Sequence, residues 1–354
     1  MSPSASTDDA WTLGRLLTEV IGSGPKSTAD MSYEQAKEAF GRILDDTPHP
    51  TTLGAFLLAN RWKGTTPTEL AAYIDELRER SDIPPGETRS VIDCGANYDG
   101  KTNTAVLGVG AGIVAATGGA PVAVHASERV PASYGTTYTQ VLSELGIPTD
   151  LSLAESTTQL QETGFGFYYQ PRFHPTLHEF LPYREAMGVR TFVNTIETLA
   201  NPANAAVHVG SFYHLAFAKK IIGAINESRS LSVDRVLMIQ GMEGYDDIRP
   251  GSTKLAEWKD GALTDTDIES STFGLGFARE DLTVENVPQS SATVTEDVLQ
   301  GDRTDHFLEA IALNAALRLY AGNIVDDIAD GVDHATEIIE SGRAAETLRR
   351  LQST

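Results

Sequence analysis

Four short segments gather residue types that bind anions, carboxylates or metal ions, and three of them directly follow an apolar stretch. The first is the glycine-rich turn 95–100 (GANYDG), and the next two polar residues are expected to open a helix. A helix N-terminus presents backbone N–H groups and a positive dipole end, which favour an anion. An ordinary strand–helix connection is the alternative, because the turn matches neither GxGxxG nor a Walker loop. The candidate binding residues are Gly95, Asp99, Gly100, Asn103 and Thr104.

The second segment supplies hydroxyl groups and a glycine after another apolar run, PVAVHA. His125 ends that run, and Ser133, Gly135 and Thr136 follow within eleven residues of it. Hydroxyl and backbone N–H donors of this kind suit phosphate oxygens. The alternative for His125 is a side chain that only closes the end of a strand.

The third and fourth segments carry charged groups suited to a carboxylate and to a metal. Arg184 follows Phe-His-Pro in a stretch with helical spacing, and arginine is the side chain that binds carboxylates with two parallel hydrogen bonds. Asp246 and Asp247 come shortly after the apolar run VLMIQ, and adjacent carboxylates commonly hold Mg²⁺ beside a phosphorylated substrate. For Arg184 the alternative is an ordinary surface arginine. For Asp246 and Asp247 it is a pair of acidic residues that occurs by chance in so acidic a chain.

The first eighty residues that precede these segments read as helices. Ser32 with Gln35, and Thr66 with Glu69, have the spacing of capping boxes before apolar periodic stretches. The Pro- and Gly-rich stretch 81–90 then reads as a linker. We therefore predict a small helical domain over residues 1–84 and a second domain over 85–354, joined by a helix around residues 175–200.

From residue 88 onward, short apolar runs alternate with helical patterns. This order is typical of an α/β fold with a mostly parallel central sheet covered on both faces. Ligands bind such sheets at the carboxyl ends of the strands, which is where the glycine turn, His125 and the Asp246–Asp247 pair stand.

Composition narrows the class of protein. The 354 residues carry 49 acidic against 27 basic side chains, a net charge of −22, and only 8 of the basic residues are lysines. An acidic, lysine-poor surface is favoured in a very salty cytoplasm, so we predict a halophilic source. The same charge disfavours nucleic-acid binding without excluding it.

A single cysteine, Cys94, rules out an internal disulfide. No apolar run approaches the ~18 residues of a membrane span, and we expect a cytoplasmic protein.

Taken together, these segments resemble one known family. From Leu13 to about Leu351 the chain is similar to the anthranilate phosphoribosyltransferases and their wider relatives, the pyrimidine nucleoside phosphorylases. The longest matching stretch runs from residue 168 to residue 212 and contains Phe-His-Pro, an arginine and Ala-Asn-Pro. The helix start GPKSTADMSYEQA, the glycine turn, VAVHA, GMEGYDDI and NAALRLYAG follow in the family's order.

The resemblance implies transfer of ribose 5-phosphate from phosphoribosyl diphosphate to a nitrogen acceptor, with Mg²⁺. Arg184 matches the arginine that binds the acceptor carboxylate, and Asp246 and Asp247 match the metal-binding Asp-Glu pair. The family's Asn-Ile-Ser-Thr is matched by a shortened Asn103-Thr104. Its Gly-Thr-Gly-Gly-Asp turn is rewritten, with Asn97 and Tyr98 in place of two glycines, and Val124 replaces its diphosphate-binding lysine.

Three functions follow from this comparison. The first is phosphoribosyl transfer to an aromatic amine, with anthranilate as acceptor, as in tryptophan biosynthesis. The second is a non-catalytic relative that binds a nucleotide or nucleic acid, which the altered turn favours. The third is a nucleoside phosphorylase. The sequence indicates no catalytic general base, and relatives of this kind commonly form homodimers through the N-terminal helices.

Overall fold

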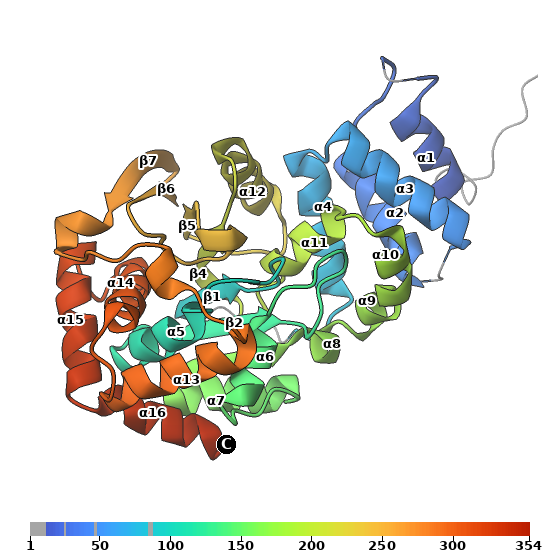
Figure 1. Cartoon of the computed structure of the whole chain (residues 1–354). Coiled ribbons are helices and arrows are strands. Elements are labelled where there is room, and N and C mark those ends of the chain that lie inside the picture. Colours follow the sequence, from blue (N-terminus) through green and yellow to red (C-terminus); the bar gives the residue numbers. More distant parts are fainter. Residues whose placement is uncertain (1–11, 25, 46–47, 84–87) are drawn as a thin grey trace, which may run out of the picture.

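The computed structural model describes residues 12–24, 26–45, 48–83 and 88–354, and these form a helical unit beside a larger α/β unit (Figure 1). The predicted boundary at residues 84 and 85 lies outside the described residues, so it stays a prediction. Among the described residues, no helix is long and apolar enough to cross a membrane.

Four helices build the N-terminal unit: α1 (Leu13–Ile21), α2 (Tyr33–Asp45), α3 (Pro50–Lys63) and α4 (Pro67–Glu79). Both predicted capping boxes form. The Glu69 side chain accepts from the Thr66 backbone N–H at 2.8 Å, and Gln35 accepts from the Ser32 backbone N–H at the same distance. Each box satisfies N–H groups that the first helical turn leaves without partners, which explains why these helices start where the sequence indicates.

A seven-stranded sheet forms the centre of the α/β unit in the described part of the chain, in the order β3-β2-β1-β4-β5-β6-β7. The first five strands are parallel: β1 (Thr88–Gly95), β2 (Val122–Ala126), β3 (Phe165–Tyr169), β4 (Ala205–Ser211) and β5 (Arg235–Ile239). The α/β class with a mostly parallel sheet is therefore confirmed. The antiparallel pair β6 (Ser252–Lys259) and β7 (Ala262–Glu269) at one edge was not predicted.

Helices cover both faces of the sheet (Figure 1). Alternation along β2 sends Val122 and Val124 into the main core, while Ala123 enters a smaller cluster on the other face. The helices that supply the main core are α5 (Gly108–Thr117), α6 (Tyr138–Glu144), α13 (Val287–Gln300), α14 (His306–Ala321), α15 (Ile328–Glu340) and α16 (Arg343–Gln352). The opposite face meets α7 (Leu153–Thr163), α12 (Leu215–Glu227) and the N-terminal unit.

The single joining helix predicted around residues 175–200 is wrong. That segment holds three short α-helices, α9 (Pro175–Glu179), α10 (Leu181–Met187) and α11 (Phe192–Ile196), and the 3-10 helix η2 (Glu197–Leu199), after the short α8 (Gln170–Phe173). Gly188 adopts a left-handed conformation with φ 64°, which ends α10, and Thr191 starts α11 with its own capping box. The segment still joins the two units, because its apolar side chains share a core with α1–α4.

Candidate active site

The glycine turn lies directly against the segment that follows β2. Gly100 has a φ of 87°, and a Cβ atom on it would lie 2.2 Å from the carbonyl carbon of Gly135. A Cβ on Gly135 would meet Gly100 at the same distance. Two backbone hydrogen bonds between Lys101 and Thr136, of 3.0 and 2.8 Å, close the contact. The structure thus brings together Gly100, Gly135 and Thr136, which the sequence assigned to two separate loops.

Replacing Gly135 with alanine is expected to lower the free energy of unfolding by about 3 kcal/mol, at the upper end of overpacking effects, because only backbone could move to admit the new methyl group. The matched control is Gly54→Ala on α3, where nothing lies within 4 Å of the added atom. That change should raise stability by up to about 1 kcal/mol through helix propensity. Urea unfolding measures both, and equal effects would contradict the close approach.

Asn103 and Thr104 do not open a helix, and this expectation is wrong. Helix α5 begins at Gly108, and the intervening loop is held by Glu243, which follows β5. The Glu243 carboxylate accepts from the backbone N–H groups of Thr102 and Thr104, both at 3.0 Å. Burial alone would raise the pKa of Glu243, but these hydrogen bonds outweigh it and lower the pKa. The N–H groups of this loop therefore bind a carboxylate of the chain itself.

Asn97 and Tyr98 fill the inside of the glycine turn. The side-chain oxygen of Asn97 accepts from the backbone N–H and the hydroxyl of Ser127, at 3.1 and 2.9 Å, which ties the ends of β1 and β2 together. The Tyr98 ring is buried with its centroid 5.2 Å from that of Tyr245. Its hydroxyl has no hydrogen-bond partner among the described residues. Tyr98 therefore occupies space that glycine would leave open.

Asp99 lies instead at a pocket of about 340 Å³ between α3 and the ends of β1 and β4. It forms an ion pair with Arg190, and Arg61 of α3 lines the same pocket. An Arg61 N–H donates to the Arg190 backbone carbonyl at 2.6 Å, so the helical unit and the α/β unit meet here. Two guanidinium groups against one carboxylate leave this pocket suited to an anionic ligand.

His125 is fully buried in a cluster on one face of the sheet. Its Nε2 lies 3.2 Å from Asp93, whose other carboxylate oxygen is 2.8 Å from Nδ1 of His208. Burial raises the pKa of Asp93, yet His125 and His208 outweigh it and lower the pKa to about 2. His125 thus contacts an internal carboxylate in this structure. The Val124 side chain points to the opposite face and is part of the main core.

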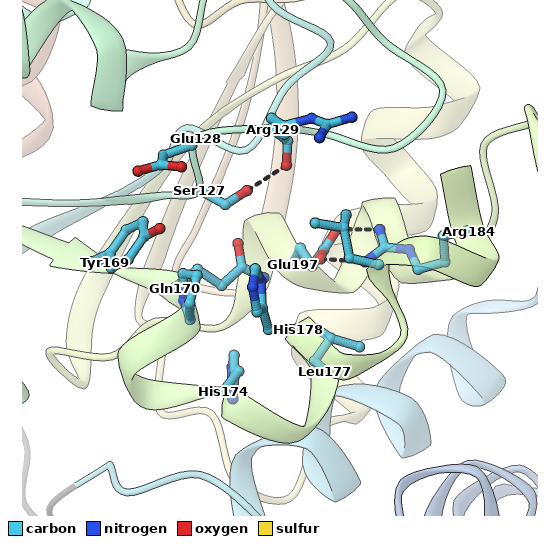
Figure 2. A pocket seen from close by; sticks show the side chains of 12 residues that line it. Ser127, Glu128, Arg129, Tyr169, Gln170, His174, Leu177, His178, Arg184 and Glu197 are labelled. Atoms are coloured by element: carbon cyan, nitrogen blue, oxygen red, sulfur yellow. Dashed lines mark hydrogen bonds and ion pairs between the residues drawn. The ribbon is translucent and has the colours of Figure 1, made fainter. Parts of the chain in front are cut away.

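Arg184 lines a second pocket, formed by the segments after β2 and β3 (Figure 2). Both carboxylate oxygens of Glu197 accept from its guanidinium, each at 2.6 Å, and both side chains are almost completely buried. Arg184 binds a carboxylate through two parallel hydrogen bonds, as arginine commonly does, but this carboxylate is the chain's own Glu197. Ser133 lies apart, partly exposed in the loop before Gly135.

Asp246 and Asp247 point into the protein interior, and both are fully buried. Asp246 accepts from the Tyr138 hydroxyl and from Arg318, each at 2.6 Å. Asp247 accepts from the buried ammonium group of Lys101, which directly follows the glycine turn. The two carboxylates therefore do lie beside the turn, but each one already contacts a cation.

Comparison with known proteins fits this architecture. Residues 91–345 match the model described as "Glycosyl transferase family, a/b domain", and residues 19–81 match its helical bundle domain. An anthranilate phosphoribosyltransferase of Methanocorpusculum labreanum is 32% identical over 92% of this chain and 94% of its own length. The chain belongs to the anthranilate phosphoribosyltransferase family. The resemblance predicted from the sequence is confirmed.

Solved members of the anthranilate phosphoribosyltransferase family share the fold along the whole chain. The Thermus thermophilus enzyme superposes with a TM-score of 0.82 at 25% identity, covering 96% of this chain and 98% of its own. The Saccharomyces cerevisiae enzyme, solved with phosphoribosyl diphosphate and Mg, gives a TM-score of 0.81 at 20% identity, covering 97% of each chain.

Four residues that shape the site in this family member were not singled out from the sequence: Lys101, Glu197, Glu243 and Arg318. The site contacts named above join them to residues between 13 and 146 positions away along the chain. Lys101 did offer a signal, because it is one of only 8 lysines and follows the turn directly. Glu197 and Arg318 stand in helical stretches, where a charged residue usually indicates a solvated face.

Proposed function

We propose that this protein transfers a phosphoribosyl group from phosphoribosyl diphosphate to the amine of an aromatic acid, with anthranilate as the acceptor. The observation that carries the proposal is the match to anthranilate phosphoribosyltransferases over nine-tenths of the chain, with both domains represented. The Arg61–Arg190 pocket beside the glycine turn supports it, because a diphosphate needs donors and positive charge at the carboxyl ends of strands.

In the proposed reaction, the bond from the anomeric carbon to diphosphate breaks as the acceptor nitrogen bonds to that carbon. The nitrogen then loses a proton to water, since an arylamine needs no strong base. The transition state resembles an oxocarbenium ion, so the leaving diphosphate gathers negative charge. Arg61 and Arg190, which line the pocket beside the turn, would stabilise that charge. Arg184 would release Glu197 and bind the acceptor carboxylate in its place, which would orient the acceptor.

Mg²⁺ does not fit the site predicted for it. Asp246 and Asp247 hold Arg318 and Lys101, and among the described residues there is no group of three or more His, Cys, Asp or Glu side chains suited to a metal. We therefore assign no step to a metal held by these carboxylates. We propose that Mg²⁺ reaches the protein as part of the substrate, bound to the diphosphate.

Non-catalytic binding of a nucleotide is the second candidate, and two contacts favour it. The guanidinium of Arg184 is already hydrogen-bonded to Glu197, and the Tyr98 ring fills the inside of the glycine turn. Either contact could keep the reactants out. The third candidate, nucleoside phosphorolysis, would use inorganic phosphate in place of diphosphate.

One assay separates the three candidates. The protein is incubated in molar KCl with phosphoribosyl diphosphate, anthranilate and Mg²⁺, while anthranilate fluorescence and diphosphate release are followed. Loss of anthranilate with equimolar diphosphate supports the proposal. Parallel reactions contain a nucleoside with inorganic phosphate, or a labelled oligonucleotide. Turnover only with the nucleoside, or binding of the oligonucleotide without turnover, would reject the proposal in favour of the corresponding candidate.

We also propose a homodimer through the N-terminal helices. On α3, Leu53, Phe56 and Leu57 are buried within the helical unit, whereas Leu58 is 49% exposed and Trp62 is 82% exposed. These two stand four positions apart on one helix face, so a second copy could cover them together. Light scattering in high salt should give twice 38.0 kDa. Trp62→Asp should give the monomer, while Tyr134→Asp, at a fully exposed tyrosine, should not.

A further inference from the structure

We propose that Lys101 and Arg318 take the place of a divalent metal ion at Asp246 and Asp247. The protein then supplies from its own side chains the positive charge that a metal would bring. What binds the two carboxylates does not depend on whether the proposed transfer reaction is correct.

The charges of the cluster already balance without a metal ion. The side chains of Asp246, Asp247 and Lys101 are 0% exposed, and that of Arg318 is 1% exposed. Two carboxylates and two cations leave the cluster neutral. A buried charge is tolerated only when it is paired, so the neutral cluster is stable as it stands. Adding a divalent ion would leave two uncompensated positive charges out of contact with water.

The two carboxylates leave few oxygen atoms open to a ligand. Both oxygens of Asp246 accept hydrogen bonds, one from Tyr138 and one from Arg318, each at 2.6 Å. One oxygen of Asp247 accepts from Lys101, and the other, Oδ1, is the only one of the four without a hydrogen-bond partner among the described residues. Mg²⁺ needs about six oxygen ligands in near-octahedral order. A single open carboxylate oxygen does not supply them.

Both cations are also held in position by groups other than the carboxylates. The Lys101 ammonium donates to the Ala105 carbonyl at 2.8 Å, and the Arg318 guanidinium donates to the Asn314 carbonyl at 3.0 Å. The Asn314 side chain in turn accepts from the backbone N–H of Ile248, directly after Asp247, at 2.7 Å. Helix α14 thus fixes both Arg318 and the acidic loop, so the pairing is built into the fold.

The unaltered protein provides the first test, with Mn²⁺ as a paramagnetic probe for the site. We expect the free protein in molar KCl to leave the electron paramagnetic resonance signal of Mn²⁺ unchanged, and its melting temperature to be equal in Mg²⁺ and in EDTA. Stoichiometric Mn²⁺ binding that disappears in Asp247→Asn would overturn the proposal. Neither measurement depends on catalytic turnover.

A gain of binding provides the second test. Lys101→Met removes the ammonium group and leaves Asp247 unpaired, so we expect Mn²⁺ to bind at least about tenfold more tightly than to the parent and to raise the melting temperature. The matched control is Arg235→Met, which breaks a largely buried pair between β5 and β6, with Glu257 at 2.6 Å, and should bring no gain. If Lys101→Met does not fold, Lys101→Gln keeps a donor for the Ala105 carbonyl and takes its place. A folded variant at Lys101 without any gain in Mn²⁺ affinity would overturn the proposal.

Discussion

The Arg184→Ala variant is expected to lose about 3–5 kcal/mol of unfolding free energy, because Glu197 would remain buried without the cation that neutralises it. The two side chains are 3% and 5% exposed, so water has little access to the Glu197 carboxylate. Urea unfolding, followed by tryptophan fluorescence, measures the loss. The double variant Arg184→Ala with Glu197→Ala should recover a large part of it, because no unpaired charge is left.

An exposed pair of the same geometry supplies the control for this prediction. Arg172 donates to both oxygens of Asp150, each at 2.7 Å, but the two side chains are 54% and 65% exposed. Solvent screening makes such pairs worth no more than about 1 kcal/mol, so Arg172→Ala should change stability little. A loss at Arg184 as small as that at Arg172 would mean that the Arg184–Glu197 pair opens readily to water.

The Tyr98→Gly variant is expected to bind phosphoribosyl diphosphate about ten to a hundred times more tightly than the parent. Removing the ring opens the turn and exposes backbone N–H groups, and one hydrogen bond to a charged group is worth about 1.5–3 kcal/mol. The same change should lower the unfolding free energy by about 3–5 kcal/mol, since the ring is buried against Tyr245. Calorimetry in molar KCl and urea unfolding measure the two effects.

Tyr98→Phe is the control for the same position. It keeps the ring and removes only a buried hydroxyl that has no partner in the described part of the chain. Affinity should therefore stay at the parental value, and stability should be equal or higher. If Tyr98→Gly binds no more tightly than Tyr98→Phe, the ring is not what limits diphosphate binding, and Val124 or the loop held by Glu243 becomes the stronger explanation.

The features that could be predicted from the sequence depend on neighbours along the chain. The Thr66–Glu69 capping box needs only a spacing of three residues, and the parallel strands are apolar runs between helices. The β6–β7 hairpin carries one local signal of its own. Asp260 and Gly261 connect the strands with φ values of 52° and 77°, and Asp-Gly is a preferred pair for such a turn. Strand β7 itself is polar and mostly exposed, so its hydrophobic pattern gave no sign of a strand.

The site was predicted less well, because its contacts join residues that are distant in the sequence. Arg184 does bind a carboxylate, but nothing in its neighbourhood showed that this would be Glu197, and its predicted contact with an acceptor carboxylate stays a prediction. Asp247 meets Lys101 across 146 positions and Asp246 meets Arg318 across 72. Such pairs depend on how the loops fold back over the strand ends, and residue type and spacing do not determine this.

The outer strand β7 has a consequence for association between molecules. An edge strand exposes backbone N–H and C=O groups that can pair with another chain. In β7, Asp265, Asp267 and Glu269 alternate along one face, and Lys254 of β6 pairs with the first two. A second copy approaching edge to edge would bring two such acidic rows together, and like charges on paired strands repel. This acidic row therefore disfavours edge-to-edge extension of the sheet into fibres. Molar salt screens these charges, so the repulsion between two copies is weakest in that condition.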